Sequence, residues 1–165
     1  MASITAISGT DFSGYTGSDY QKMKGIATSP DGAIIYVSIM GVSVMKSTNS
    51  GANWNQVYNT GGTSIACSSN GQIVYVVKLG DGLYKSTDAG TNWNVVTFLP
   101  NITLPGDNAN PEKTDFGGYD LSNIYQVACD DTGSKLIMTT NAAAAIYRST
   151  DGGSTVVLYL CCSRI

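Results

Sequence analysis

The chain has 165 residues, a length typical of one domain, and charged side chains make up 13% of it, about half the usual share of roughly 25%. With 19 glycines, this composition excludes charge-driven disorder, collagen and a coiled coil rich in Glu and Lys. The formal net charge is −3 and there is no histidine, so the chain lacks a basic field and the commonest metal ligand and general base. We therefore expect no nucleic-acid partner, metal site or cofactor.

Residues 1–25 are predicted to form a leading loop or strand. They lack a basic region followed by an apolar run, and no stretch of the chain approaches the ~20 apolar residues that span a bilayer. We expect neither a secretory signal nor a membrane span, and the sequence leaves the localisation open. The segment contains Thr10-Asp11-Phe12-Ser13-Gly14-Tyr15, which recurs 104 residues later as Thr114-Asp115-Phe116-Gly117-Gly118-Tyr119.

Residues 26–60 read as four short strands. Residues 26–29 are apolar, and the turn Pro30-Asp31-Gly32 leads into a β-branched and aromatic run over 33–39. Gly41 turns the chain again, and in 42–48 Val42, Val44 and Lys46 alternate with the other side chains. Alternation of this kind predicts a third strand. A polar turn then leads to a fourth strand that begins near Trp54.

The same pattern returns twice, over 65–97 and 126–160. Ile26-Ala27-Thr28 corresponds to Ile65-Ala66-Cys67 and to Val127-Ala128-Cys129, at offsets of 39 and then 62 residues. Four antiparallel strands per ~40 residues form one blade of a β-propeller. We predict an all-β domain of about three such blades, a partial or oligomer-completed propeller with almost no helix. Cys67 and Cys129 are expected to be buried free thiols, and the spacing of the four cysteines fits no zinc ribbon or disulfide framework.

The turn between the third and fourth strands of each unit carries a family resemblance. It resembles the Asp-box, or bacterial neuraminidase repeat, with the pattern Ser-x-Asp-x-Gly-x-x-Trp. Its residues here are Ser47, Asn49, Gly51 and Trp54; Ser86, Asp88, Gly90 and Trp93; and Ser149, Asp151 and Gly153, with Val156 in place of Trp. We expect a structural role: the Asp or Asn caps its own turn, the Gly adopts a positive φ, and the Trp covers the outer edge of the blade.

Residues 98–125 are predicted to be a long loop between blades, and loops of this length often carry function. Because strands alternate in direction, this loop should lie on the face opposite the Asp-box turns. Our candidate ligand-binding residues on that face are Asp11, Phe12, Tyr15, Asp81, Asp115, Phe116 and Tyr119. The alternative is that the Phe and Tyr rings anchor these segments to a blade while the Asp caps a turn.

The resemblance implies three functional classes. Sialidases of this type use an arginine cluster and a Tyr–Glu pair, whereas this chain has only Arg148, Arg164 and one glutamate, Glu112. A xyloglucan-hydrolase type needs two facing carboxylates, and no motif here pairs the available aspartates. The third class, which resembles photosystem II stability and assembly factors, is non-catalytic. We predict a scaffold without catalytic residues that binds a protein or a glycan; the alternative is a glycoside hydrolase fragment that uses aspartates of the loop face.

The last ten residues, 156–165, contain no Trp, Gly, Asp or Asn. We interpret them as a truncated or frame-shifted end of a longer repeat; the alternative is that 157–160 form the fourth strand of the third blade. Three blades are fewer than the four to eight that close a propeller. We therefore predict self-association, for example two chains in a six-bladed ring. The alternative is a monomeric open fan whose first 25 residues and tail cover the end blades.

Overall fold

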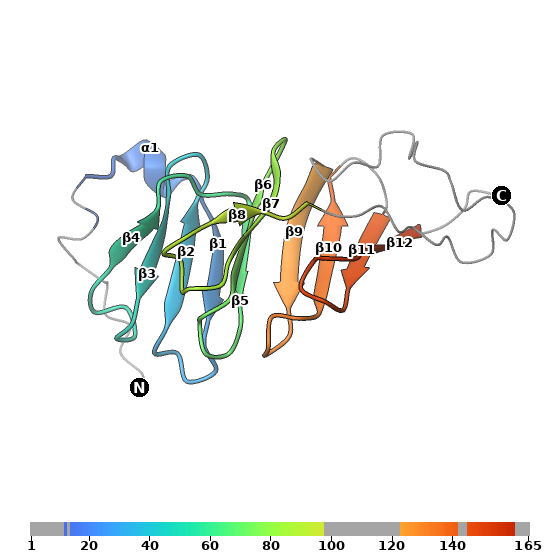
Figure 1. Ribbon diagram of the computed structural model, residues 1–165. Coiled ribbons are helices and arrows are strands. Elements are labelled where there is room, and N and C mark those ends of the chain that lie inside the picture. Colours follow the sequence, from blue (N-terminus) through green and yellow to red (C-terminus); the bar gives the residue numbers. More distant parts are fainter. Residues whose placement is uncertain (1–11, 13, 98–122, 142–144, 161–165) are drawn as a thin grey trace, which may run out of the picture.

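A computed structural model describes residues 12, 14–97, 123–141 and 145–160 (Figure 1). Within these ranges the chain forms three four-stranded antiparallel sheets, and each sheet uses four consecutive strands in chain order. The all-β architecture of three blades is therefore confirmed. One short helix, α1 (Gly17–Tyr20), lies before the first sheet, and no helix of the described residues is long and apolar enough to cross a membrane.

Each blade has the same construction. Blade 1 consists of β1 (Met23–Thr28), β2 (Ile35–Ile39), β3 (Ser43–Ser47) and β4 (Asn55–Tyr58). Blade 2 consists of β5 (Ser64–Cys67), β6 (Val74–Lys78), β7 (Gly82–Ser86) and β8 (Asn94–Val95). Blade 3 consists of β9 (Ile124–Cys129), β10 (Leu136–Thr140), β11 (Ala145–Ser149) and β12 (Val157–Leu160). The first strands β1, β5 and β9 are neighbours in space, so the blades stand side by side in chain order (Figure 1).

Turn chemistry explains where the first hairpin of blade 1 reverses. The Asp31 carboxylate accepts hydrogen bonds from the Ser29 hydroxyl (2.6 Å) and from the Ala33 backbone N–H (3.0 Å). Gly32 has a φ of 70°, which most residues with a Cβ avoid. Asn70 with Gly71 repeats this arrangement in blade 2. The predicted hairpin turns are thus confirmed, because short polar side chains satisfy the turn backbone locally.

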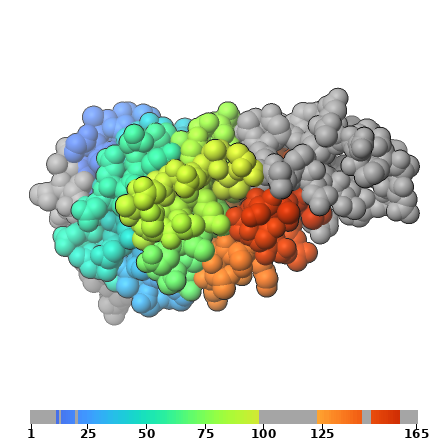
Figure 2. Space-filling model, in the orientation of Figure 1, coloured from blue at the N-terminus to red at the C-terminus, as the bar shows by residue number. Residues whose placement is uncertain are grey.

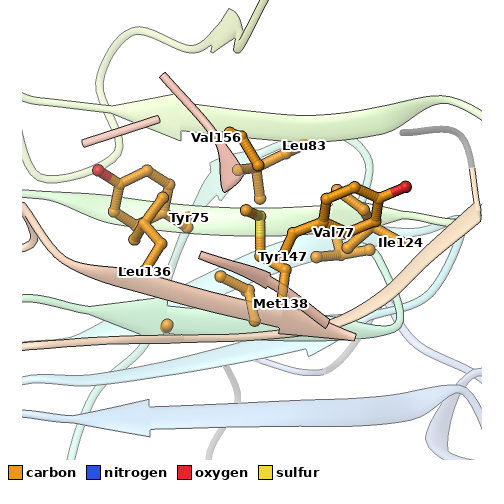
Figure 3. Close-up of a cluster of buried hydrophobic side chains, with 10 residues drawn as sticks. Tyr75, Val77, Leu83, Ile124, Leu136, Met138, Tyr147 and Val156 are labelled. Carbon is orange, nitrogen blue, oxygen red and sulfur yellow. The ribbon is translucent and has the colours of Figure 1, made fainter. Parts of the chain in front are cut away.

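The core lies between the blades. We call the side of a blade that faces its predecessor the leading face, and the side that faces its successor the trailing face. Between blades 1 and 2 the buried residues are Tyr36, Val44, Ile65, Val74 and Val76. Between blades 2 and 3 they include Tyr75, Val77, Leu83, Ile124, Leu136, Met138, Tyr147 and Val156 (Figure 3). Burying one such side chain contributes about 1.5–3 kcal/mol, so these two layers are the main source of stability.

A third buried cluster lies on the leading face of blade 1, where the described residues form no preceding blade. Ile39, Met45 and Trp54 are buried there, and Phe12 and Tyr15 pack against them. The predicted third strand forms as β3, and it is buried on both of its faces. Four of its five residues are buried, because β3 lies between blade 2 and this leading segment.

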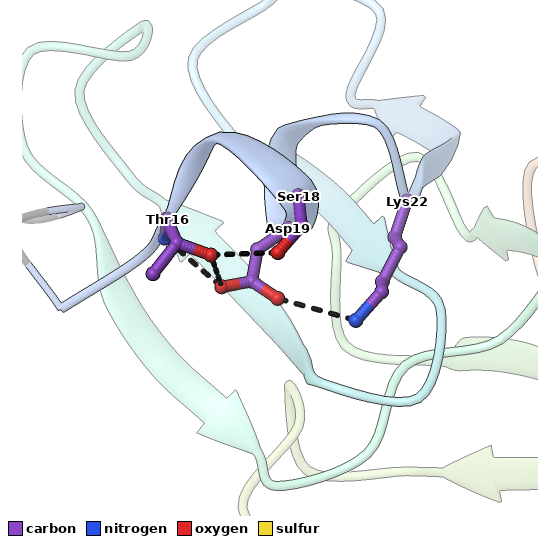
Figure 4. A network of polar contacts seen from close by, with 4 residues as sticks. All are labelled: Thr16, Ser18, Asp19 and Lys22. Atoms are coloured by element: carbon purple, nitrogen blue, oxygen red, sulfur yellow. Dashed lines mark hydrogen bonds and ion pairs between the residues drawn. The ribbon is translucent and has the colours of Figure 1, made fainter.

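Polar contacts hold the short helix that follows this segment (Figure 4). The Asp19 carboxylate accepts hydrogen bonds from the Thr16 backbone N–H (2.9 Å) and hydroxyl (2.8 Å), and it lies 3.3 Å from the Lys22 ammonium. The contacts with Thr16 are the main reason that the pKa of Asp19 is lowered. The network turns the chain from the cluster on blade 1 into β1.

The structure bears on two further expectations, the fourth strand of blade 3 and the burial of two cysteines. The fourth strand of blade 3 exists as β12, so the alternative for residues 157–160 is confirmed, while 161–165, with two cysteines, lie outside the described residues. Cys67 and Cys129 are free thiols but only half-buried, which corrects the expectation of burial. Burial raises the pKa of Cys129 to about 12.

Candidate functional site: an aromatic groove between blades 1 and 2

A tyrosine and a lysine fasten each blade to its successor. The Tyr36 hydroxyl lies 2.8 Å from the Gly71 carbonyl oxygen and 3.2 Å from that of Ala89. The Lys46 ammonium donates to the same Ala89 oxygen (3.2 Å) and lies 5.6 Å from the centre of the Tyr36 ring. Tyr36 and Lys46 are cross-strand neighbours on β2 and β3, so the register of blade 1 presents both donors together.

Blade 2 repeats this latch on blade 3. The Tyr75 hydroxyl lies 2.7 Å from the Gly133 carbonyl oxygen and 3.3 Å from that of Gly152. The Lys85 ammonium donates to the Gly152 oxygen (3.1 Å) and lies 5.4 Å from the ring centre of Tyr75. The tyrosines of the latch are buried and the lysines half-buried, and the contacts have the same form at both interfaces. Its role is structural, because it satisfies turn carbonyls that the packing removes from water.

One acceptor of each latch, Ala89 or Gly152, belongs to the turn between the third and fourth strands, and these turns share one hydrogen-bond pattern. In blade 2 the Ser86 hydroxyl donates to the Asp88 carboxylate (2.8 Å), and the Gly90 N–H donates to the Ser86 oxygen (2.8 Å). The Asp88 carboxylate also accepts from the Asn92 N–H (2.8 Å). The turns at Ser47 and Ser149 are bonded in the same way.

The expected backbone and capping roles in these turns are confirmed. The glycines Gly51, Gly90 and Gly153 have φ angles of 86°, 94° and 96°. Hydrogen bonds from the backbone N–H of Asn92 lower the pKa of Asp88 to about 2, and those from Thr155 lower the pKa of Asp151 to about 2. Both carboxylates therefore stay ionised down to strongly acidic pH and hold their own turns.

A shallow depression of about 440 Å³ lies at the outer edge of the interface between blades 1 and 2. We call it the aromatic groove, and its lining residues are Gln56, Val57, Tyr58, Asn59, Thr91, Asn92 and Trp93. Blade 1 supplies the first four from β4 and the residue after it, and blade 2 supplies the others from its last turn. In Figure 2 the yellow-green region of blade 2 around β8 borders the teal surface of blade 1 at this place.

Stacked rings form the floor of the groove. The Tyr58 and Trp93 rings lie 4.8 Å apart at 20°, and Tyr84 lies 6.2 Å from Tyr58. The Trp93 indole N–H is held by carbonyl oxygens of Gly90 (2.8 Å) and Val57 (3.2 Å). The ring is therefore fixed by backbone from both blades, which limits its rotation and presents a rigid aromatic surface.

A charged cluster adjoins the groove. The Lys78 ammonium lies 3.6 Å from the centre of the Tyr84 ring and 5.0 Å from that of Tyr58. It also lies 3.4 Å from the Asp81 carboxylate, which accepts a hydrogen bond from the Tyr84 hydroxyl (2.9 Å). Partial burial acts to lower the pKa of Lys78, but a hydrogen bond with Tyr58 and the nearby rings and carboxylate outweigh burial and raise it. The lysine therefore stays protonated and orients both tyrosines.

This arrangement suits binding. Aromatic rings present flat apolar surface at low entropic cost, and Gln56, Asn59 and Asn92 place donors and acceptors around them. A flat ligand with an apolar side and polar edges fits such a groove, which holds for the ring of a sugar and for an amphipathic peptide. No three His, Cys, Asp or Glu side chains among the described residues are grouped to hold a metal ion.

The structure places the candidate ligand-binding residues in different parts of the molecule. Asp81 lies in the charged cluster beside the groove. Phe12 and Tyr15 lie on the other side of blade 1, where Phe12 contacts Trp54 edge-on (5.6 Å between ring centres) and the Tyr15 hydroxyl is 2.7 Å from that of Ser43. These contacts favour the alternative that the two rings anchor the leading segment. Asp11, Asp115, Phe116 and Tyr119 lie outside the described residues.

The leading segment contacts both ends of blade 1. Tyr15 contacts Ser43, which follows the turn between β2 and β3, and Phe12 contacts Trp54, which ends the Ser47 turn. The segment follows the uncovered leading face of blade 1 toward this turn, because the apolar side chains there need a cover.

Sequence reasoning missed the groove. Trp93 was given only a structural role, and Tyr58, Tyr84 and Lys78 were given none. A usable signal exists: at positions equivalent to Tyr58 and Trp93, blade 2 has Thr97 and blade 3 has Val156. A comparison of equivalent positions in the three units therefore shows that the Tyr58–Trp93 pair occurs at one interface and is not part of the repeat.

No model of a known protein family matches the chain, and no curated protein matches it in sequence. Solved structures do. A chain of a nidogen/laminin complex aligns with a TM-score of 0.60 at 15% identity, over 82% of this chain and 47% of that one. YCF48 bound to a D1 peptide aligns with a TM-score of 0.58 at 15% identity, over 83% and 40%. A GH74 enzyme from Niastella koreensis aligns with a TM-score of 0.58 at 20% identity, over 84% and 22%.

These similarities establish the fold. At 15–20% identity they show that the three blades form part of a β-propeller, a fold that these neighbours use both in enzymes and in proteins solved with a protein or peptide partner. The chain spans less than half of the length of each of these proteins.

Proposed function

We propose that this chain is a non-catalytic β-propeller scaffold that binds a protein or a glycan through the aromatic groove. The observation that carries this proposal is that, among the residues that the structure describes, the groove occurs at the interface of blades 1 and 2 and not at that of blades 2 and 3. The latches of Tyr36 and Tyr75 are repeated, as a structural element should be. The groove residues Gln56 and Asn92 are instead replaced by Val95 and Thr155 at the next interface.

Two further features support a non-catalytic scaffold. The carboxylates of Asp88 and Asp151 are occupied by their own turns, and Asp81 is paired with Lys78 and Tyr84. We also assign the three turns to the Asp-box type, because they share the Ser–carboxylate–Gly or Ser–amide–Gly bonding pattern.

The alternative function, a glycoside hydrolase fragment, would use aspartates of the loop face.

The groove can be tested with two kinds of probe. Xyloglucan and cello-oligosaccharides are titrated while Trp fluorescence is followed, and a random peptide library displayed on phage is selected against the chain. Trp93 is half-buried whereas Trp54 is buried, so a change in emission should come from the groove. We expect one class of probe to bind.

Exposed groove variants make the test specific. Gln56→Ala and Asn59→Ala should weaken that binding at least fivefold, while Gln72→Ala, at an exposed residue that does not line the groove, should not. Binding by neither class, or binding that is unchanged in both groove variants, contradicts the groove as the site. Release of sugars from xyloglucan or from a fluorogenic sialoside contradicts the non-catalytic proposal.

We also propose that the chain completes its propeller by self-association. The support is apolar surface at both ends of the three-blade array, at Ile26 and Ile137. Exposed sheet faces of this kind favour association. Light scattering at micromolar concentration should give the mass of an oligomer, at least twice the 17.3 kDa of one chain. A mass of one chain at all concentrations contradicts this proposal.

A further inference from the structure

The leading face of blade 1 is only partly covered. Ile26 is 68% exposed, whereas its equivalents Ile65 and Val127 are 5% and 7% exposed because a blade precedes them. Phe12 and Tyr15 cover the part of this face around Trp54 and Met45. Phe12 contacts Trp54 edge-on, at the position where Tyr58 of blade 1 stacks on the equivalent Trp93 of blade 2. The leading segment therefore replaces the outer strand of a preceding blade, and the position of Ile26 on the inner strand stays open.

The trailing face of blade 3 shows the complementary gap. Ile137 stands where Tyr36 and Tyr75 form the latch, and it is 47% exposed. Arg148 stands where Lys46 and Lys85 donate, directly opposite Ile137 in the register of β10 and β11. Its side chain is exposed, and no hydrogen bond or ion pair joins it to another described residue. Blade 3 thus presents a cationic donor and an apolar side chain at the latch position.

Blade 1 presents the acceptors that such a donor needs. The latch carbonyls of blade 2 are those of Gly71 and Ala89, and those of blade 3 are Gly133 and Gly152. The equivalents in blade 1 are Gly32 and Ser50, whose carbonyl oxygens accept no hydrogen bond from the described residues. Ser50 has a φ of 56°, close to the 60° of Ala89, so its carbonyl has the same local geometry.

We infer that the trailing face of blade 3 docks on the leading face of blade 1 in a second copy of this chain. In this contact the Arg148 guanidinium donates to the turn carbonyls of Gly32 and Ser50, and Ile137 and Ile26 become buried. The inference rests on the proposed self-association, and it continues the interface that already joins blades 1, 2 and 3. The contact is head-to-tail, since it joins two different surfaces of the chain.

The test uses single charge insertions and their mixture. Ile26→Asp damages only the leading face and Ile137→Asp only the trailing face, while Leu79→Asp, at a residue with 46% exposure in the β6–β7 turn, is the matched control. Analytical ultracentrifugation gives the dissociation constant of each. We expect both end variants to weaken self-association at least tenfold and the control to leave it unchanged. Arg148→Glu should also weaken self-association.

Mixing decides the polarity of the contact. An equimolar mixture of Ile26→Asp and Ile137→Asp keeps one intact pair of surfaces, so heterodimers should form where neither variant associates alone. Association of the wild type that is unaffected by either end variant, or a mixture that stays monomeric, overturns the head-to-tail contact and leaves self-association standing. A monomeric wild type overturns both. Circular dichroism of each variant, expected to match that of the wild type, confirms that the surfaces and not the fold have changed.

Discussion

The two blade interfaces share an inner design and differ at the outer edge. Both have a buried tyrosine and a lysine on turn carbonyls of the next blade, and both bury aliphatic side chains of the middle strands. At the outer edge the first interface has the stacked Tyr58 and Trp93, and the second has Thr97 and the buried Val156. The contacts that both interfaces share stabilise the fold, whereas the outer edge differs between them. The outer edge of the first interface is therefore the better candidate for a binding surface.

The largest expected change in stability concerns the aliphatic side chains that are buried between the blades. Leu83→Ala removes a side chain with no exposed surface from the second interface, and we expect a loss of about 2–5 kcal/mol in the free energy of unfolding. Val44→Ala, at the equivalent position of the first interface, should cost less because fewer carbons are removed. Urea unfolding followed by circular dichroism measures both values. A cost below that of Val44→Ala would contradict the layer as the core of blades 2 and 3.

The next effect concerns the two latches. Tyr75→Phe and Tyr36→Phe each remove a hydroxyl from two carbonyl oxygens, and each should cost about 1–3 kcal/mol, because a buried acceptor loses its donor. Equal costs within about 0.5 kcal/mol are expected, because the two hydroxyls have equivalent pairs of turn carbonyls as acceptors. A loss at one interface only would contradict the equivalence of the latches.

The strands and turns could be predicted because their causes are local. β-Branched runs and Asp-Gly or Asn-Gly turns act over a few residues, and the positive φ at Gly90 follows from one turn. The groove could not be predicted in this way, because Tyr58 and Trp93 meet only when two blades pack. The same holds for Phe12: the sequence shows a repeated aromatic residue, while its packing on Trp54 depends on which face of blade 1 is uncovered.

Acid sensitivity sharpens the comparison between turns. Hydrogen bonds, above all that from the Asn92 backbone N–H, hold the pKa of Asp88 at about 2, below its ordinary value of 3.8, so the folded state favours the carboxylate. The contribution of Asp88 to the free energy of unfolding is complete above pH ~4 and is lost as the pH falls toward 2. Asp88→Asn should flatten the dependence of stability on pH in this window, and Asn49→Asp should steepen it. Thermal unfolding between pH 2 and 6 measures both slopes, and unchanged slopes would show that these turns do not govern acid unfolding.

The smallest effect concerns the backbone of the turns that carry the latch acceptors. Ala89 has a φ of 60°, where the turn of blade 3 has Gly152 at 69°. Ala89→Gly relieves a strained left-handed residue, and the gain is offset by the larger entropy of glycine in the unfolded chain. We expect a net stabilisation of up to about 1 kcal/mol in urea unfolding. A loss of more than about 1 kcal/mol would show that the alanine methyl group makes a packing contact of its own.

The central claim is that the aromatic groove, and not the repeated latch, contacts the ligand. Nuclear magnetic resonance can test it with the two indole N–H signals, because Trp93 lies in the groove and Trp54 is the equivalent residue under Phe12. On addition of the saccharide or peptide selected as a binder, the signals of Trp93 and of the Gln56, Asn59 and Asn92 side-chain amides should shift, and that of Trp54 should not. Shifts that spare these groove signals and appear elsewhere would contradict the account.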